Sequence, residues 1–194
     1  VVEQAGGPEV LQLKERPMPT PHMGWVRIRV KAFGLNRAEM FTRQGHSPGV
    51  EFPRVIGIEA VGVVDEAPNG EFAVGQTVAT LMGGMGRQFD GSYAEYTCVP
   101  ATNVFPLQTD LEWSTLGAIP EMFQTVYGSL TLGLEVQAGQ TLLIRGGTSS
   151  IGMLATTLAN DRGLTGMATT RNPQKESALR ENGVDQVVIS EGRL

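Results

Sequence analysis

The sequence is poor in the residues that bind structural metals or form disulfides. Its 194 residues include one cysteine, Cys98, and two histidines, His22 and His46. One cysteine cannot close a disulfide within the chain, and a cysteine-rich zinc lobe needs about four. These counts exclude a disulfide framework and a cysteine-rich zinc site. We interpret both histidines as loop residues and expect no bound metal.

The chain also lacks an excess of positive charge and a long apolar run. It has 15 lysines and arginines against 20 aspartates and glutamates, a net charge of -5. Domains that bind nucleic acids are usually basic, and a bilayer-crossing helix needs about 20 apolar residues. We therefore expect neither a nucleic-acid nor a membrane partner, and a cytoplasmic location.

Glycine, by contrast, is abundant, and its 25 residues are scattered as expected for many tight turns. The first hundred residues have the pattern of β-structure. Residues 26–30 alternate apolar and basic side chains, the period of a strand with one buried face. Residues 77–81 and 93–97 predict two more strands. Short strands at this spacing favour a small barrel or sandwich.

After residue 100 the pattern changes to alternating helices and strands. Residues 112–133 have the apolar spacing of helix, and Pro120 is expected to separate two helices. Buried parallel strands are predicted at 141–145, 164–170 and 187–189. The order strand, helix, strand, helix, strand is one half of a doubly wound parallel sheet.

Two helices are expected between these strands. The first ends near Gly163, and its buried face is predicted to carry Ile151, Leu154, Ala155, Leu158 and Ala159. The second begins at Asn172, a capping residue, with Pro173 in the first helical position. A complete doubly wound sheet has six strands, and only three are found, so we expect that the chain is truncated within this domain.

A glycine-rich turn stands between the first of these strands and its helix, where a dinucleotide-binding turn belongs. Small residues let the backbone approach a pyrophosphate, and the helix N-terminus attracts negative charge. The pattern is small-x-x-small-x-x-Gly rather than G-x-G-x-x-G. A strand-to-helix turn without a ligand is the alternative. The predicted binding residues are Gly146, Gly147, Thr148, Ser149, Ser150, Ile151 and Gly152.

The end of the second parallel strand predicts which nicotinamide cofactor binds. NAD sites usually have Asp or Glu there, whereas this chain has Thr170 and Arg171, with Lys175 one turn later. Two cations suit a 2'-phosphate, which accepts charge-assisted hydrogen bonds. NADPH is therefore the predicted cofactor, and two solvated surface cations are the alternative.

Several further motifs occur in a characteristic order along the chain. They are Gly34–Arg37 with Arg43 and Gly45, residues 53–64, residues 90–96, and residues 118–127. Together they resemble the zinc-independent quinone oxidoreductase branch, which includes ζ-crystallin, of the medium-chain dehydrogenase/reductase superfamily. The resemblance implies a GroES-like β-barrel domain at residues 1–110. A partial Rossmann doubly wound parallel sheet, which binds NADPH, would follow at residues 111–194.

The zinc-dependent branch of this superfamily has a cysteine and a histidine where this chain has Asn36 and Ile58. The resemblance therefore implies a reaction without metal. It assigns Asn36 and Thr125 to the nicotinamide end of the pocket, and capping of a turn or helix is the alternative role for each. The implied reaction is hydride transfer from NADPH to a quinone or to an alkene conjugated with a carbonyl. A homodimer is implied for the longer protein.

One residue departs from the family pattern. Relatives often have a tyrosine near the substrate where this chain has Phe41, which can stack on a flat quinone but cannot donate a proton. Arg43 is a candidate for binding an anionic substrate, or for a structural ion pair. The predicted catalytic residues are thus Asn36, Phe41 and Arg43. An enoyl-thioester reductase, or an NADPH-binding sensor or interaction protein with little catalysis, are the alternative functions.

Overall fold

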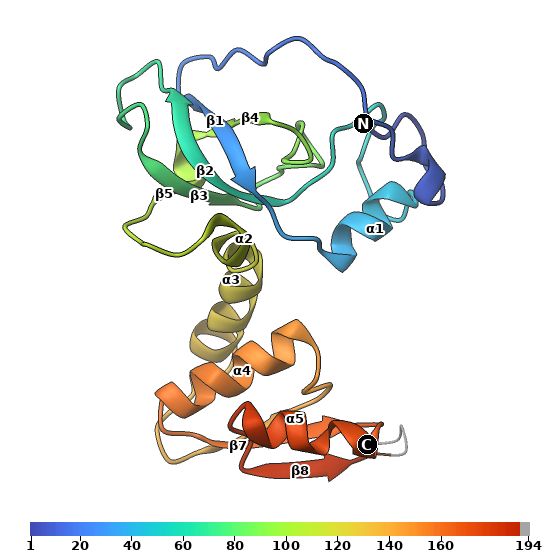
Figure 1. The fold of residues 1–194 in the computed structure, drawn as a ribbon, viewed down its shortest axis with the longest axis vertical. Coiled ribbons are helices and arrows are strands. Elements are labelled where there is room, and N and C mark those ends of the chain that lie inside the picture. Colours follow the sequence, from blue (N-terminus) through green and yellow to red (C-terminus); the bar gives the residue numbers. More distant parts are fainter. Residues whose placement is uncertain (191–194) are drawn as a thin grey trace. The chain divides into compact units, whose positions relative to one another are not determined.

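A computed structural model describes residues 1–190 (Figure 1). Contacts within the chain divide it into two compact units, Val1–Glu121 and Met122–Leu194. Each unit has its own cluster of buried apolar side chains. The boundary at residue 110 stays a prediction.

The first unit is built on a curled antiparallel sheet of five strands in the order β4-β1-β2-β3-β5 (Figure 1). The strands predicted around residues 26–30 and 77–81 are confirmed. The strands are β1 (Trp25–Ala32), β2 (Glu59–Glu66), β3 (Thr77–Leu81), β4 (Tyr96–Pro100) and β5 (Val104–Pro106). Short 3-10 helices are found at Pro8–Val10 and Ala101–Asn103.

Alternation along the strands explains how this sheet is buried. Val26 and Ile28 of β1, and Ala60 and Val64 of β2, are fully buried in one cluster. Val61, which follows Ala60 in β2, points to the other face of the sheet and packs with helix α2 (Trp113–Leu116). Because both faces are covered, β2 is buried along most of its length. Burial of each large aliphatic side chain contributes about 1.5–3 kcal/mol to folding.

In this unit one helix was not predicted, and one predicted strand requires correction. The sequence pattern did not indicate helix α1 (Arg37–Arg43), because its buried side chains are polar rather than apolar. The strand expected at 93–97 begins only at Tyr96. Tyr93 lies outside the strand because it bonds elsewhere: its backbone N–H donates to the Ile56 carbonyl, and its hydroxyl donates to Glu39.

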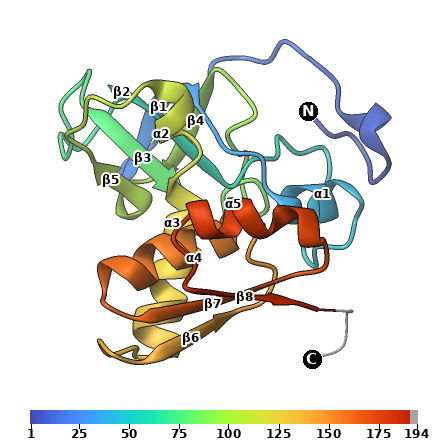
Figure 2. The ribbon, with the colours of Figure 1, turned by 60° about the horizontal axis from the view of Figure 1, so that its bottom comes forward.

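The second unit contains a parallel sheet of three strands in the order β6-β7-β8. Figure 2 shows the strands side by side, with α5 along the sheet. The predicted order of strands and helices is confirmed. The elements are β6 (Thr141–Ile144), α4 (Ser150–Asp161), β7 (Thr165–Thr170), α5 (Glu176–Glu181) and β8 (Gln186–Ile189), with a 3-10 turn at Pro173–Lys175.

Helix α3 (Pro120–Gly128) begins at the proline expected to separate two helices, and it continues into a π-helical turn at Ser129–Gly133. Val126 and Leu130 from this segment are buried in the core of the second unit. They pack there with side chains from all three parallel strands and from α4 and α5.

The buried face of α4 is confirmed except at Ile151, since Leu154 and Leu158 are partly buried and pack against the core. Ala155 and Ala159 are buried as expected, but Ile151 is 38% exposed. Gly152 and Thr156 are buried instead. Gly152 is buried because it packs directly on the backbone of the preceding turn.

Candidate functional site

Three glycines shape the turn between β6 and α4. Gly146 has a φ of +70°, in the left-handed region where glycine is strongly favoured. A Cβ added to Gly147 would lie 2.7 Å from the Cβ of Ala168 on β7. A Cβ added to Gly152 would lie 2.6 Å from the carbonyl oxygen of Gly146. A larger residue would be strained by the backbone conformation at Gly146, would press on β7 at Gly147, and would push α4 away from the turn at Gly152.

Ser149 caps the helix that follows. Its hydroxyl oxygen accepts the backbone N–H of Gly152 at 3.0 Å and donates to the carbonyl oxygen of Gly146 at 2.9 Å. The serine in the middle position of the motif therefore fixes the turn through its own hydrogen bonds. The N–H groups of Ser150 and Ile151, at the start of α4, have no acceptor within the helix. Such groups are suited to binding an anion.

A cavity of about 410 Å³ lies beside this turn. Its charged lining side chains are Arg145, at the end of β6, and Arg171, at the end of β7. No acidic side chain lines it among the described residues. The other lining residues are Gly146, Thr148, Thr169, Thr170 and Ser190.

The ends of the two strands are held together at this cavity. The Thr169 hydroxyl oxygen accepts the backbone N–H of Gly146 at 3.1 Å, and the Thr169 carbonyl accepts that of Gly147 at 2.9 Å. The Thr170 hydroxyl oxygen accepts the N–H of Asn172 at 3.2 Å. The hydrogen bonds of both threonines therefore shape the cavity and hold the start of the Arg171 segment.

This arrangement fits a phosphorylated nicotinamide dinucleotide. The turn and the start of α4 suit a pyrophosphate, and the two arginines suit a further phosphate. Lys175, the other predicted cation, is exposed and does not line the cavity. Arg145 was not among the predicted binding residues. The feature of the sequence that could have indicated Arg145 is its position directly before the glycine turn.

In the first unit, Asn36 belongs to a buried polar network. Its side-chain amide donates to Oε1 of Glu59 at 2.7 Å, and its backbone N–H donates to Oε2 of Glu39 at 2.7 Å. Glu39 also accepts from the backbone N–H of Ile58 and from the hydroxyl of Tyr93, both at 2.8 Å. Glu39 and Glu59 are each only 2% exposed. Sequence analysis did not identify them as a pair, because 20 positions separate them.

Burial dominates the electrostatics of this network. Desolvation raises the pKa of Glu39 and of Glu59 above the ordinary value of 4.5, although hydrogen bonds to each carboxylate oppose the shift. Desolvation and the neighbouring Glu39 also raise the pKa of Tyr93. Gly34 makes room for the network, because a Cβ there would overlap Oε1 of Glu59.

The other predicted catalytic residues lie on α1. Phe41 is 38% exposed and has the guanidinium of Arg37 over its ring, 5.5 Å from the ring centre. Arg43 is only 7% exposed. Residues two positions apart on a helix do not face each other, so α1 does not bring these two side chains together. The catalytic roles of Phe41 and Arg43 therefore stay predictions.

Thr125 lies on α3 in the second unit and is exposed. Its backbone carbonyl accepts the hydroxyl of Ser129 at 2.7 Å, a bond within the helix. Its proposed contact with a nicotinamide group stays a prediction.

The described residues contain no group of three or more His, Cys, Asp and Glu side chains that could hold a metal ion. His22 and His46 lie outside helices and strands, as predicted. None of the helices in the described part of the chain has the length and apolar character needed to cross a membrane.

Residues 22–109 match the alcohol dehydrogenase GroES-like domain. The human quinone oxidoreductase is 29% identical to the chain over 194 residues, covering 96% of the chain and 56% of that enzyme. The chain thus spans a little over half the length of the curated relatives it matches.

Two solved structures extend the comparison over both units. The quinone oxidoreductase of Pseudomonas syringae pv. Tomato DC3000 matches with a TM-score of 0.89 and 26% identity, covering 98% of the chain and 58% of that enzyme. A mycobacterial protein in complex with NADPH matches with a TM-score of 0.87 and 26% identity, covering 99% of the chain and 58% of that protein.

Proposed function

Because the chain belongs to the zinc-independent quinone oxidoreductase branch of the medium-chain dehydrogenase/reductase superfamily, we propose that the intact protein is an NADPH-dependent reductase. Its substrates would be quinones or alkenes conjugated with a carbonyl group. The observation that carries the cofactor assignment is the pair Arg145 and Arg171 in a cavity beside a glycine turn.

Bound NADPH would supply a hydride, and the chain would supply the binding groups. The backbone N–H groups at the start of α4 would hold the pyrophosphate, since the partial positive charge of the helix is greatest there. Arg145 and Arg171 would hold the 2'-phosphate through charge-assisted hydrogen bonds. An NAD-type site would have a carboxylate at the end of β7, and this chain has Thr170 there.

In the first unit, we propose that Glu59 positions Asn36 for a role at the nicotinamide end. The hydrogen bond from its amide nitrogen to Glu59 fixes which way the Asn36 side chain points. We propose that its amide oxygen, which faces the backbone N–H of Glu39 in the capping box of α1, accepts from a carboxamide. Thr125 is proposed for the same end of the cofactor. Phe41 would pack against a flat substrate. Water would supply the proton, because a phenyl ring has no acidic proton to donate.

The test is to titrate the intact protein with NADPH and NADH, following nucleotide fluorescence. NADPH should bind more tightly than NADH. Arg171→Ala and Arg145→Ala should each weaken NADPH binding by roughly tenfold or more, the loss expected for one hydrogen bond to a charged group. Both variants should leave NADH binding nearly unchanged.

Lys175→Ala is the matched control, because it removes an exposed cation outside the cavity. Its effect on NADPH binding should be smaller than that of Arg171→Ala. Equal affinity for both nucleotides would contradict the cofactor assignment. NADPH binding without turnover across a panel of quinones and enones would instead support a sensor or interaction role.

A further inference from the structure

The loop that follows β3 is folded tightly onto the segment before β2. Met82 has a φ of +56°, an unusual conformation for a residue with a side chain, and Gly86 has a φ of +71°. A Cβ on Gly86 would lie 2.5 Å from the carbonyl oxygen of Gly57. Met82 is anchored by its backbone N–H, which donates to the Ile58 carbonyl at 2.7 Å. These constraints give the loop a fixed shape.

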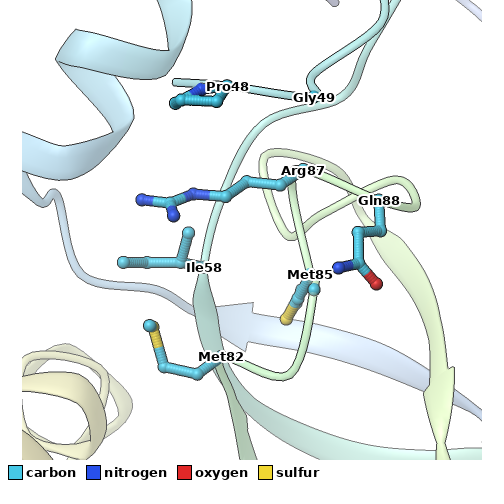
Figure 3. Close-up of a pocket in the computed structure, with 8 residues that line it drawn as sticks. Pro48, Gly49, Ile58, Met82, Met85, Arg87 and Gln88 are labelled. Carbon is cyan, nitrogen blue, oxygen red and sulfur yellow. The ribbon is translucent and has the colours of Figure 1, made fainter. Parts of the chain in front are cut away.

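A cavity of about 260 Å³ lies against this loop within the first unit (Figure 3). Its lining includes Pro48, Ile58, Met82, Met85, Arg87 and Gln88, and we name it the Arg87 pocket. Arg87 is the only charged residue that lines it among the described residues. In Figure 3 its side chain extends from the loop between Pro48 and Ile58.

Arg87 has no acidic partner among the described residues. The buried Arg43 shares this lack, and of these two arginines it is Arg87 that lines the cavity described here. The Nε of Arg87 is buried and has no hydrogen-bond partner, and none of the ion pairs within residues 1–190 involves Arg87. By contrast, Arg27 pairs with Asp65 at 2.6 Å and Arg54 pairs with Asp90 at 3.3 Å. A partly buried cation without a partner is costly, so an anion from outside the chain would stabilise it.

We propose that the Arg87 pocket binds a carboxylate group of the substrate. The guanidinium is planar and presents paired N–H donors that match a carboxylate. Met82, Met85 and Ile58 offer apolar contacts for the adjoining carbon atoms. The cavity is slightly smaller than the usual 300–1,000 Å³ of a ligand site, as suits the anionic end of a small molecule.

This inference rests on the proposed reductase function and narrows its substrate class to conjugated carbonyl compounds that carry a carboxylate. In their reduction a hydride from NADPH adds to the alkene carbon that is β to the ketone. Water protonates the α carbon, the double bond becomes single, and NADPH becomes NADP+. The carboxylate is unchanged and serves only to position the molecule.

The test compares two substrates, 4-oxo-2-pentenoate and its neutral methyl ester, in the intact protein. The measured quantity is the ratio of kcat/KM for the acid to kcat/KM for the ester. Differences in intrinsic reactivity cancel when this ratio is compared between variants. Arg87→Gln should lower the ratio at least tenfold, Arg87→Lys should lower it less, and Arg29→Gln, an exposed control with the same charge change, should leave it unchanged.

Direct binding separates this inference from the proposed function. Saturated 4-oxopentanoate, titrated by calorimetry, should bind the wild type and lose at least tenfold in affinity in Arg87→Gln, while NADPH affinity stays constant in both. If that result is found but neither substrate is turned over, carboxylate binding by the Arg87 pocket is supported and the proposed reductase function is contradicted. An unchanged ratio, or unchanged 4-oxopentanoate affinity, in Arg87→Gln would overturn the inference. Equal displacement of 4-oxopentanoate by inorganic phosphate would overturn its restriction to carboxylates.

Discussion

The side-chain amide of Asn36 donates a 2.7 Å hydrogen bond to Oε1 of Glu59, although the two residues are 23 positions apart. The bond links the start of α1 to the start of β2. The other carboxylate oxygen of Glu59 accepts the backbone N–H of Glu121 at 2.8 Å, where α3 begins. One buried carboxylate therefore joins three segments of the first unit: the start of α1, the start of β2 and residues 120–121.

Asn36→Ala is expected to destabilise the first unit. The substitution leaves Oε1 of Glu59 without this donor in a buried setting, and such a loss costs about 1–3 kcal/mol. Chemical denaturation of Asn36→Ala, Glu59→Gln and the double variant measures the coupling between the two residues. The double variant should lose less free energy of unfolding than the sum of the two single losses. Additive losses would show that the hydrogen bond contributes nothing to stability.

The buried carboxyl groups should also make stability depend on pH. Burial raises the folded-state pKa of Glu39 and Glu59 above 4.5, so the folded chain binds these protons more readily than the unfolded chain. Their contribution to the free energy of unfolding is greatest below pH 4.5 and falls as the pH rises through the raised values. The free energy of unfolding of the wild type minus that of the double variant Glu39→Gln/Glu59→Gln should therefore decrease over that pH interval and then level off. A difference that grows with pH would contradict the direction of both shifts.

Much of the fold could be predicted because apolar periodicity encodes it. The alternation in β1 and the strand–helix order after residue 140 follow directly from side-chain spacing. Helix α1 could not be predicted this way, since it buries Glu39, Thr42 and Arg43. Polar side chains are buried only where partners from distant segments meet them, and one sequence does not show those partners.

The candidate site was predictable to a similar degree. The glycine turn and Arg171 follow from local motifs, whereas Arg145 joins Arg171 only because parallel pairing brings the ends of β6 and β7 together. Arg87 belongs to a loop without a familiar motif. Its significance depends on the cavity in front of it and on the absence of an ion-pair partner among the described residues, and both are properties of the folded chain.

Cys98 should react slowly with alkylating agents at neutral pH. It lies on β4, and burial raises the pKa of its thiol to about 11, so little thiolate is present at pH 7. Iodoacetamide labelling, followed by mass spectrometry, should be far slower in the folded protein than in urea at the same pH. Rapid labelling of the folded protein at pH 7 would show that the thiol is accessible to the reagent and that its pKa is not raised.

Gly152→Ala should weaken NADPH binding, because the new Cβ would lie 2.6 Å from the Gly146 carbonyl oxygen and 2.7 Å from the Gly147 Cα. These are backbone atoms, so the turn or the start of α4 must move. Gly128→Ala is the matched control: it lies in helical conformation with no atom within 4 Å of the added Cβ. Alanine there should stabilise the helix by about 0.5–1 kcal/mol. Fluorescence titration should show lower NADPH affinity for Gly152→Ala alone, and equal affinities for both variants would mean that the tight turn is not needed for binding.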